Sequence, residues 1–281
     1  MRIRWLGTAG HALEAGGTTV LLDPFLTRPS IFTTAARRLR PTPARWRSFL
    51  PPRVDAVLLG HSHYDHLMDA PLIAREAGAL IVGSPSTASF ARAEGVAEDK
   101  IVTVPPTGRS LSVGAFTIRF VPSLHGRLLA GRVPLPGEVT TPPRLPARLF
   151  DYRMGGAFGI HLEACGVSVY HNGSANLVDA ELDGLGARVV LLGLAGRYGT
   201  PDYARRVTDR LRPELVVPTH HDAFFAPLEE GVRLLPGIDL GGFVRELGRV
   251  SPDSRVITPT YDDVLVVPED QPASEAVLID R

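Results

Sequence analysis

The chain has 281 residues, of which 44% are hydrophobic, and this is enough apolar side chain to bury a large core. Its 30 basic and 30 acidic residues cancel, so net charge gives no reason to expect nucleic acid or an anionic membrane as a partner. Cys165 is the only cysteine, which excludes an intramolecular disulfide and a metal site built from thiolates alone. The sequence shows no signal-peptide pattern and no long apolar run, and we expect a globular, cytoplasmic protein without a transmembrane segment.

The first sixty residues begin as a β-meander and end in a short apolar run typical of a buried strand. The pattern predicts strands at 2–6, 11–14, 18–22 and 55–60. Between the third and the fourth of these strands, a Pro- and Arg-rich stretch at about 26–53 interrupts the pattern. We interpret this stretch as a surface excursion.

The rest of the chain alternates between strands and helices, which favours one layered α/β domain spanning 1–281. Helices are predicted at 70–77 and 86–93, and strands at 79–82, 101–104, 116–121, 157–163, 167–171, 189–194 and 214–218. A second Pro-rich excursion occupies 126–154. Because loops of that length in compact domains are commonly functional, it is a candidate substrate lid.

The segment that carries chemistry follows directly on the strand at 55–60. HSHYDH places His61, His63, Asp65 and His66 within six residues. Alternate residues of an extended segment point the same way, so His61 and His63 can face one metal ion while Asp65 and His66 turn toward a second. Imidazole and carboxylate ligands suit Zn²⁺, Fe or Mn. The alternative is a solvated, histidine-rich turn without a metal.

This motif resembles the signature of the metallo-β-lactamase superfamily, and later segments resemble that family in the same order. The opening RIRWLGTAGHALEAGGTTVLLDPF is similar to the first hairpin of the branch with the ascorbate-phosphate lactonases and the phospholipase D that cleaves N-acyl phosphatidylethanolamine. The resemblance implies a four-layer αββα sandwich with two mixed β-sheets packed face to face. It also implies that Asp23 in the LLDP turn supports a metal ligand without binding the metal itself.

The resemblance extends to two further histidines at predicted strand ends. VPSLHG is similar to the family segment whose histidine completes the first metal site, which makes His125 the partner of His61 and His63. VVPTHHDAF is similar to the late segment that carries the last ligand, which makes His220 the partner of Asp65 and His66.

The bridging position departs from the family pattern. VYHNGSAN places Ser174 where relatives carry an aspartate that bridges the two metal ions. The outcome can be a dinuclear site without the bridge, a weak second site, or a site completed by His171 or Asn172. We favour two ions, because one subclass of metallo-β-lactamases also has serine here and holds two zinc ions.

A second departure lies in the opening hairpin, where Thr8 stands in place of the histidine that commonly follows Trp-Leu-Gly in relatives. We interpret His11 and His161 as structural. His221 adjoins a predicted ligand, and contact with the substrate is an open alternative for it.

The resemblance implies a metal-dependent hydrolase, in which a metal-activated hydroxide attacks a small or medium-sized ester, lactone or phosphoester, phosphodiesters included. Asp65 and His66 are the expected catalytic residues, with Asp65 orienting the hydroxide and relaying a proton to the leaving group. The expected cofactor is Zn²⁺, as one or two ions with two favoured, and Mn²⁺ or Fe is an alternative.

The substrate class stays open at this level. Arginines at 37–53, together with Arg127 and Arg197, are suited to clamp a phosphate, whereas the apolar content of 126–154 favours an acyl or lactone substrate. Two other classes of function remain: a metal-retaining binding or scaffold protein, and a di-iron redox protein. No basic recognition module is visible, so we expect a small-molecule substrate and no nucleic acid.

Overall fold

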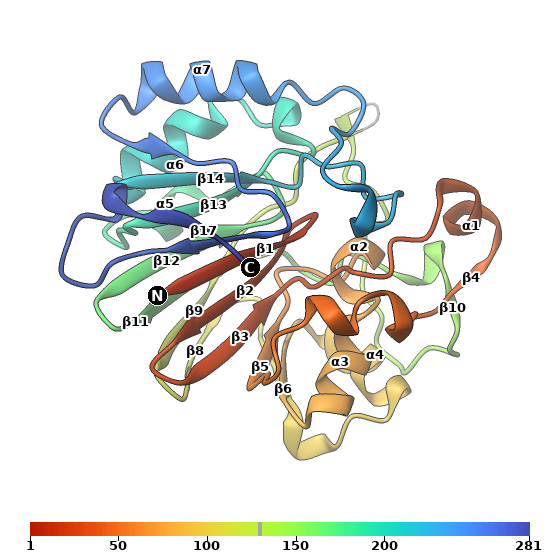
Figure 1. Cartoon of the computed structure of the whole chain (residues 1–281). Coiled ribbons are helices and arrows are strands. Elements are labelled where there is room, and N and C mark those ends of the chain that lie inside the picture. Colours follow the sequence, from red (N-terminus) through yellow and green to blue (C-terminus); the bar gives the residue numbers. More distant parts are fainter. Residues whose placement is uncertain (129–130) are drawn as a thin grey trace.

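The computed structural model describes residues 1–128 and 131–281, and it confirms the predicted αββα sandwich. Two large mixed β-sheets pack against each other, and helices cover their outer faces (Figure 1). Among the described residues, none of the helices has the length and apolar character needed to span a bilayer.

The first sheet has eight strands and changes from antiparallel to parallel pairing at β3. Its strands are, in spatial order, β17 (Val277–Asp280), β16 (Asp263–Val266), β1 (Arg2–Gly7), β2 (Gly10–Ala15), β3 (Thr18–Leu22), β5 (Ala56–Leu58), β6 (Leu80–Gly83) and β7 (Ile101–Thr103). The parallel strands are connected by helices, which are α2 (Tyr64–Leu67), α3 (Ala70–Ala77) and α4 (Pro85–Glu94).

The second sheet has seven strands and changes from parallel to antiparallel pairing at β12. Its strands are, in spatial order, β15 (Arg255–Val256), β14 (Leu215–Thr219), β13 (Val189–Gly193), β12 (Val167–Asn172), β11 (Phe158–Ala164), β9 (Phe116–Pro122) and β8 (Arg109–Val113). The helices on its outer side are α5 (Asp179–Leu182), α6 (Tyr203–Leu211) and α7 (Leu240–Val250) (Figure 1).

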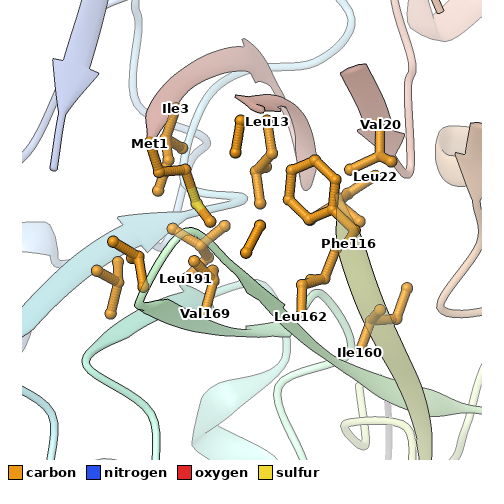
Figure 2. Packing of buried hydrophobic residues seen from close by; sticks show 14 of the residues in the cluster. Met1, Ile3, Leu13, Val20, Leu22, Phe116, Ile160, Leu162, Val169 and Leu191 are labelled. Carbon is orange, nitrogen blue, oxygen red and sulfur yellow. The ribbon is translucent and has the colours of Figure 1, made fainter. Parts of the chain in front are cut away.

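The main core lies between the two sheets. Side chains such as Leu13 and Val20 from the first sheet meet Phe116 and Leu162 from the second (Figure 2). A second apolar cluster lies under α3 and α4, and a third under α6 and α7. Because the central strands are covered on both faces, their sequences are nearly continuous apolar runs, such as VVLLG in β13.

The two Pro-rich excursions contact each other. The first contains α1 (Ile31–Ala36), two short 3₁₀ turns (Pro43–Arg45 and Arg47–Phe49) and β4 (Arg38–Leu39), which pairs with β10 (Ala147–Arg148) of the second. The second also has a 3₁₀ turn at Leu149–Asp151, and its residues 129 and 130 lie outside the described part of the chain.

The interpretation of 26–53 as a surface excursion is wrong for part of its side chains. Leu39 and Trp46 are buried, with Trp46 only 1% exposed, although Phe32 is 83% exposed. Both buried side chains join the cluster that also includes α3, because burying large apolar groups outweighs the turn-forming character of the surrounding prolines.

Candidate metal centre

The predicted ligand residues follow the ends of three strands, one in the first sheet and two in the second. HSHYDH comes after β5, and α2 begins immediately after His63. His125 comes after β9, and His220 comes directly after β14. Strand ends of both sheets thus supply the side chains that converge at this edge of the sandwich.

The first group consists of His61, His63 and His125, whose candidate ligand atoms all lie within 4.8 Å of one another. Their ring centroids are 4.8 Å apart in each of the three pairs. This is the set that the sequence predicts for the first metal ion. The structure brings the three side chains together, and their role as ligands stays a prediction.

The second group consists of Asp65, His66 and His220, which also lie within 4.8 Å of one another. Oδ2 of Asp65 is 3.3 Å from Nε2 of His220 and 3.9 Å from Nε2 of His66. The rings of His61 and His66 have centroids 3.8 Å apart, so the two groups are neighbours. This arrangement can hold two ions side by side.

The first group has the properties that a metal site requires. His61 is 1% exposed, yet neither of its ring nitrogens has a hydrogen-bond partner among the described residues. Leaving buried imidazole nitrogens unpaired costs free energy, whereas a metal ion would satisfy one of them. Burial and the neighbouring His66 lower the pKa of His61 well below its usual value, so the ring is neutral as a ligand must be.

The other two rings of this group are oriented by backbone carbonyls. Nδ1 of His125 donates to the carbonyl of Gly126 at 2.7 Å, and Nε2 of His63 donates to the carbonyl of Pro134 at 3.0 Å. Burial lowers the pKa of His125 to about 4, so this ring is neutral too. One nitrogen of each ring is thus fixed by the protein, and the other is left for a metal ion.

Asp23 supports the second group from the turn after β3. Its Oδ1 accepts from the backbone N–H of Gly60 at 2.7 Å, while Oδ2 lies 3.1 Å from Nδ1 of His66 and accepts from Nε2 of His171 at 2.9 Å. Burial opposes ionisation, but His66 and His171 lower the pKa of Asp23. Burial also opposes protonation of His66, but Asp23 and Asp65 together raise the pKa of that ring. Asp23 therefore contacts the ring of His66, and its role in supporting a metal ligand stays a prediction.

Ser174 is not part of either group in the described chain. Its hydroxyl donates to the carbonyl of Leu124 at 2.9 Å, and its own carbonyl accepts from the N–H of Gly126 at 2.6 Å. These two bonds hold the main chain on both sides of His125. Asn172, one of the two alternatives to a bridging ligand, donates its side-chain amide to the carbonyl of Asn176, and the other, His171, bonds Asp23.

Thr8 supports His220 through its main chain. The carbonyl of Thr8 accepts from the N–H of His220 at 2.7 Å and from the hydroxyl of Thr219 at 2.7 Å. Both Thr8 (φ 54°) and His220 (φ 53°) have left-handed backbone conformations, which are unfavourable for a β-branched residue in particular. Such backbone strain costs about 1–3 kcal/mol per residue. It persists where surrounding contacts hold the residue in that conformation, and this is typical of functional sites.

Sequence reasoning missed a buried charged cluster behind His220. Asp222 is fully buried, pairs with the guanidinium of Arg28, and accepts from the N–H of Thr8 at 2.9 Å and from the hydroxyl of Tyr261 at 2.7 Å. Although burial opposes ionisation, Arg28 and then Tyr261 lower the pKa of Asp222. The one sequence feature that could have indicated this cluster is that the acidic Asp222 stands two positions after the predicted ligand His220.

The histidines interpreted as structural have contacts of that kind. Nδ1 of His11 bonds the carbonyl of Ala9 at 3.0 Å, and Nε2 of His161 bonds the carbonyl of Gly186 at 2.9 Å. His221 is buried and stacks on Trp5 with ring centroids 4.7 Å apart. This stacking speaks against contact between His221 and a substrate.

The arginines suggested as a phosphate clamp are dispersed, and several are engaged within the protein. Arg197 pairs with Glu246 at 2.7 Å, Arg47 pairs with Glu76 at 3.1 Å, and Arg53 pairs with Asp55 at 2.7 Å. Arg127, in contrast, lines a cavity beside His125.

Comparison with known proteins identifies the family. Residues 2–220 match the family model described as "Beta-lactamase superfamily domain". The chain belongs to this family. It is 29% identical over 268 residues to a UPF0173 metal-dependent hydrolase of Methanopyrus kandleri. The matched region covers 92% of this chain and 96% of the relative.

Solved structures confirm the fold of this beta-lactamase superfamily member. The metallo hydrolase Igni18 of Ignicoccus hospitalis is similar with a TM-score of 0.61 and 20% identity, covering 100% of this chain and 98% of the other. An isothiocyanate hydrolase from Delia radicum gut bacteria is similar with a TM-score of 0.60 and 20% identity, covering 95% and 98%. At this identity the likeness establishes the fold alone.

Proposed function

We propose that this chain binds two metal ions, with Zn²⁺ favoured, and hydrolyses a small or medium-sized ester, lactone or phosphoester. The broad class is that of a metal-dependent hydrolase of the beta-lactamase superfamily. The observation that carries the proposal is the pair of adjacent groups, with His61, His63 and His125 in one and Asp65, His66 and His220 in the other. Donor sets of imidazole and carboxylate suit Zn²⁺, and Mn²⁺ or iron is the alternative.

The metal ions, when bound, supply positive charge that activates water near neutral pH and stabilises the negative charge that develops on the substrate. Asp65 is suited to orient the attacking water. Burial opposes its ionisation, but His66 and His220 lower its pKa, so it is a carboxylate that can accept a hydrogen bond from water. As the water attacks, its proton can move to this carboxylate, which can then pass the same proton to the leaving group. Asp23 keeps His66 in place during these steps.

Two other functions fit parts of the same geometry. A scaffold protein would retain the metal but lack turnover, and a di-iron redox protein would carry iron and absorb visible light. Hydrolysis is favoured because relatives that match most of the chain are named metal-dependent hydrolases.

The test combines metal analysis with an activity screen. We expect about two metal ions per chain in the purified protein and hydrolysis of at least one class among aryl esters, lactones and aryl phosphodiesters. His61→Ala should lower the metal content and reduce kcat/KM by more than about 100-fold. His161→Gln is the matched control, because His161 lies in neither group and its contacts are the carbonyl of Gly186 and the carboxylate of Glu163. Less than one metal ion per chain, or full activity in His61→Ala, would refute the proposal.

A further inference from the structure

A cavity of about 350 Å³ lies beside His125, among strand ends of both sheets and the second excursion. This volume is near the lower end of the range for small-molecule sites, which is roughly 300–1,000 Å³. Its walls are largely apolar, with side chains of Val104, Leu124, Val133, Met154 and Phe158. The cavity is therefore built for a hydrocarbon group of limited size.

The charges around the cavity do not favour a phosphate. Among the described residues that line it, only Arg127 and Glu138 carry a charged side chain, and both are exposed. One positive and one negative group give no net positive charge at the mouth, whereas phosphate recognition relies on clustered guanidinium or ammonium groups. The interior walls therefore dominate selectivity, and they favour an apolar ligand.

The cavity adjoins the first ligand group at a single residue. His125 belongs to both. The same excursion that forms one wall also contacts the HSHYDH segment, because the carbonyl of Met154 accepts from the N–H of Ser62 at 2.9 Å and the carbonyl of Pro134 bonds His63. A substrate whose reacting carbonyl lies at the metal centre can therefore extend its acyl arm into this cavity.

The walls are held in place by hydrogen bonds. Met154 N–H donates to Leu135 at 2.9 Å, Gly155 N–H donates to Gly137 at 2.9 Å, and Val139 N–H donates to the hydroxyl of Ser86 at 2.7 Å. Binding therefore requires little ordering of the protein, and this lowers its entropic cost.

We propose that this cavity binds the apolar acyl arm of an ester or lactone substrate. The inference rests on the proposed hydrolase function and narrows the substrate class from three to the carboxylic esters and lactones. Val133 and Met154 are the apolar lining residues that the excursion supplies, so this excursion is expected to set the acyl-chain preference of the enzyme.

The first measurement is the rate of hydrolysis of p-nitrophenyl esters from acetate to decanoate by the metal-loaded wild-type enzyme. Each added methylene should raise kcat/KM about three- to four-fold until the cavity is full, after which the rate levels off or falls. Val133→Trp, which places a large ring at the cavity wall, should remove most of this length dependence. Val277→Trp is the matched control, because Val277 is exposed on β17, outside the cavity, and this variant should keep the full dependence.

A second measurement separates failure of the cavity from failure of the hydrolase. Calorimetric titration of the metal-loaded protein with octanoate and acetate should show at least ten-fold tighter binding of octanoate, and Val133→Trp should lose that difference. If esters are cleaved with no length dependence, or if aryl phosphodiesters alone are cleaved, the cavity inference is wrong while the hydrolase stands. If octanoate binds selectively but no substrate is cleaved, the hydrolase proposal fails and the acyl-binding cavity remains.

Discussion

Asp23 and Ser174 contact the proposed metal centre in different ways. Asp23 contacts the ring of His66 directly, with an oxygen 3.1 Å from Nδ1. Ser174 bonds only main-chain groups near His125 and the amide oxygen of Asn172. A carboxylate that orients a ligand ring affects metal affinity, whereas a hydroxyl bonded to the main chain affects mainly stability.

This difference predicts opposite results for two conservative substitutions. Asp23→Asn removes the charge beside His66, so the affinity of the second group for metal should fall about 10–100-fold. The metal content should then drop toward one ion per chain. Ser174→Ala should keep both ions and lower the free energy of unfolding by about 0.5–1.5 kcal/mol. Metal content after dialysis against a weak chelator and urea denaturation of each variant measure these effects. Loss of one ion in Ser174→Ala, with both retained in Asp23→Asn, would instead make Ser174 a ligand.

At the scale of single residues, the sequence predicts the side chains that occur in a compact motif and misses those defined by distant contacts. The six residues of the two groups could be named because HSHYDH, VPSLHG and VVPTHHDAF are each recognisable at a strand end. Arg28 could not be named, because it looks like any other arginine in its stretch and its partner Asp222 is 194 residues away. Pairing across such a separation depends on the whole fold.

At the scale of elements, apolar runs predict the central strands well, and the helix α3 covers the predicted 70–77. The edge strands β8 and β17 and the helices α6 and α7 were not predicted. Four of the five residues of β8 are partly or fully exposed, and only two of the five, Leu111 and Val113, are apolar. The strand therefore lacks the continuous apolar run by which the central strands are recognised. β16 pairs with β1, and β17 pairs with β16, so the C-terminal strands extend the first sheet beyond the N-terminal strand. No local sequence pattern indicates this contact between segments far apart in the chain.

The buried pair of Arg28 and Asp222 joins the first excursion to the segment after β14. Arg28→Met leaves the carboxylate of Asp222 buried and without its guanidinium partner, which typically costs about 3–5 kcal/mol of stability. Arg53→Met is the matched control, because the side chain of Arg53 is 70% exposed and surface ion pairs contribute about 0–1 kcal/mol. Urea denaturation measures both. If both variants lose the same small amount of unfolding free energy, the hydrogen bonds from Tyr261 and Thr8 are enough to stabilise the buried carboxylate of Asp222 without Arg28.

At the scale of the whole molecule, the proposed metal centre takes its residues from both sheets. Asp65 and His66 follow a strand of the first sheet, whereas His125 and His220 follow strands of the second. Any ion bound by these residues therefore contacts both halves of the sandwich. A ligand that binds only the folded state stabilises it by mass action, so metal binding and global stability are linked in this fold.

Removal of the metal should therefore destabilise the entire chain in one transition. With metal at about 1,000 times its Kd, binding contributes roughly 4 kcal/mol, which corresponds to a fall in Tm of about 10 °C after chelation. Differential scanning calorimetry before and after dialysis against a chelator, and again after Zn²⁺ is restored, measures this change. Before chelation, His61→Ala should already have the lower Tm, because its first ligand group cannot form. Its Tm should then change little when the chelator is added. A wild-type Tm that is indifferent to chelation would show that no ion links the sheets, and the dinuclear centre would have to be abandoned.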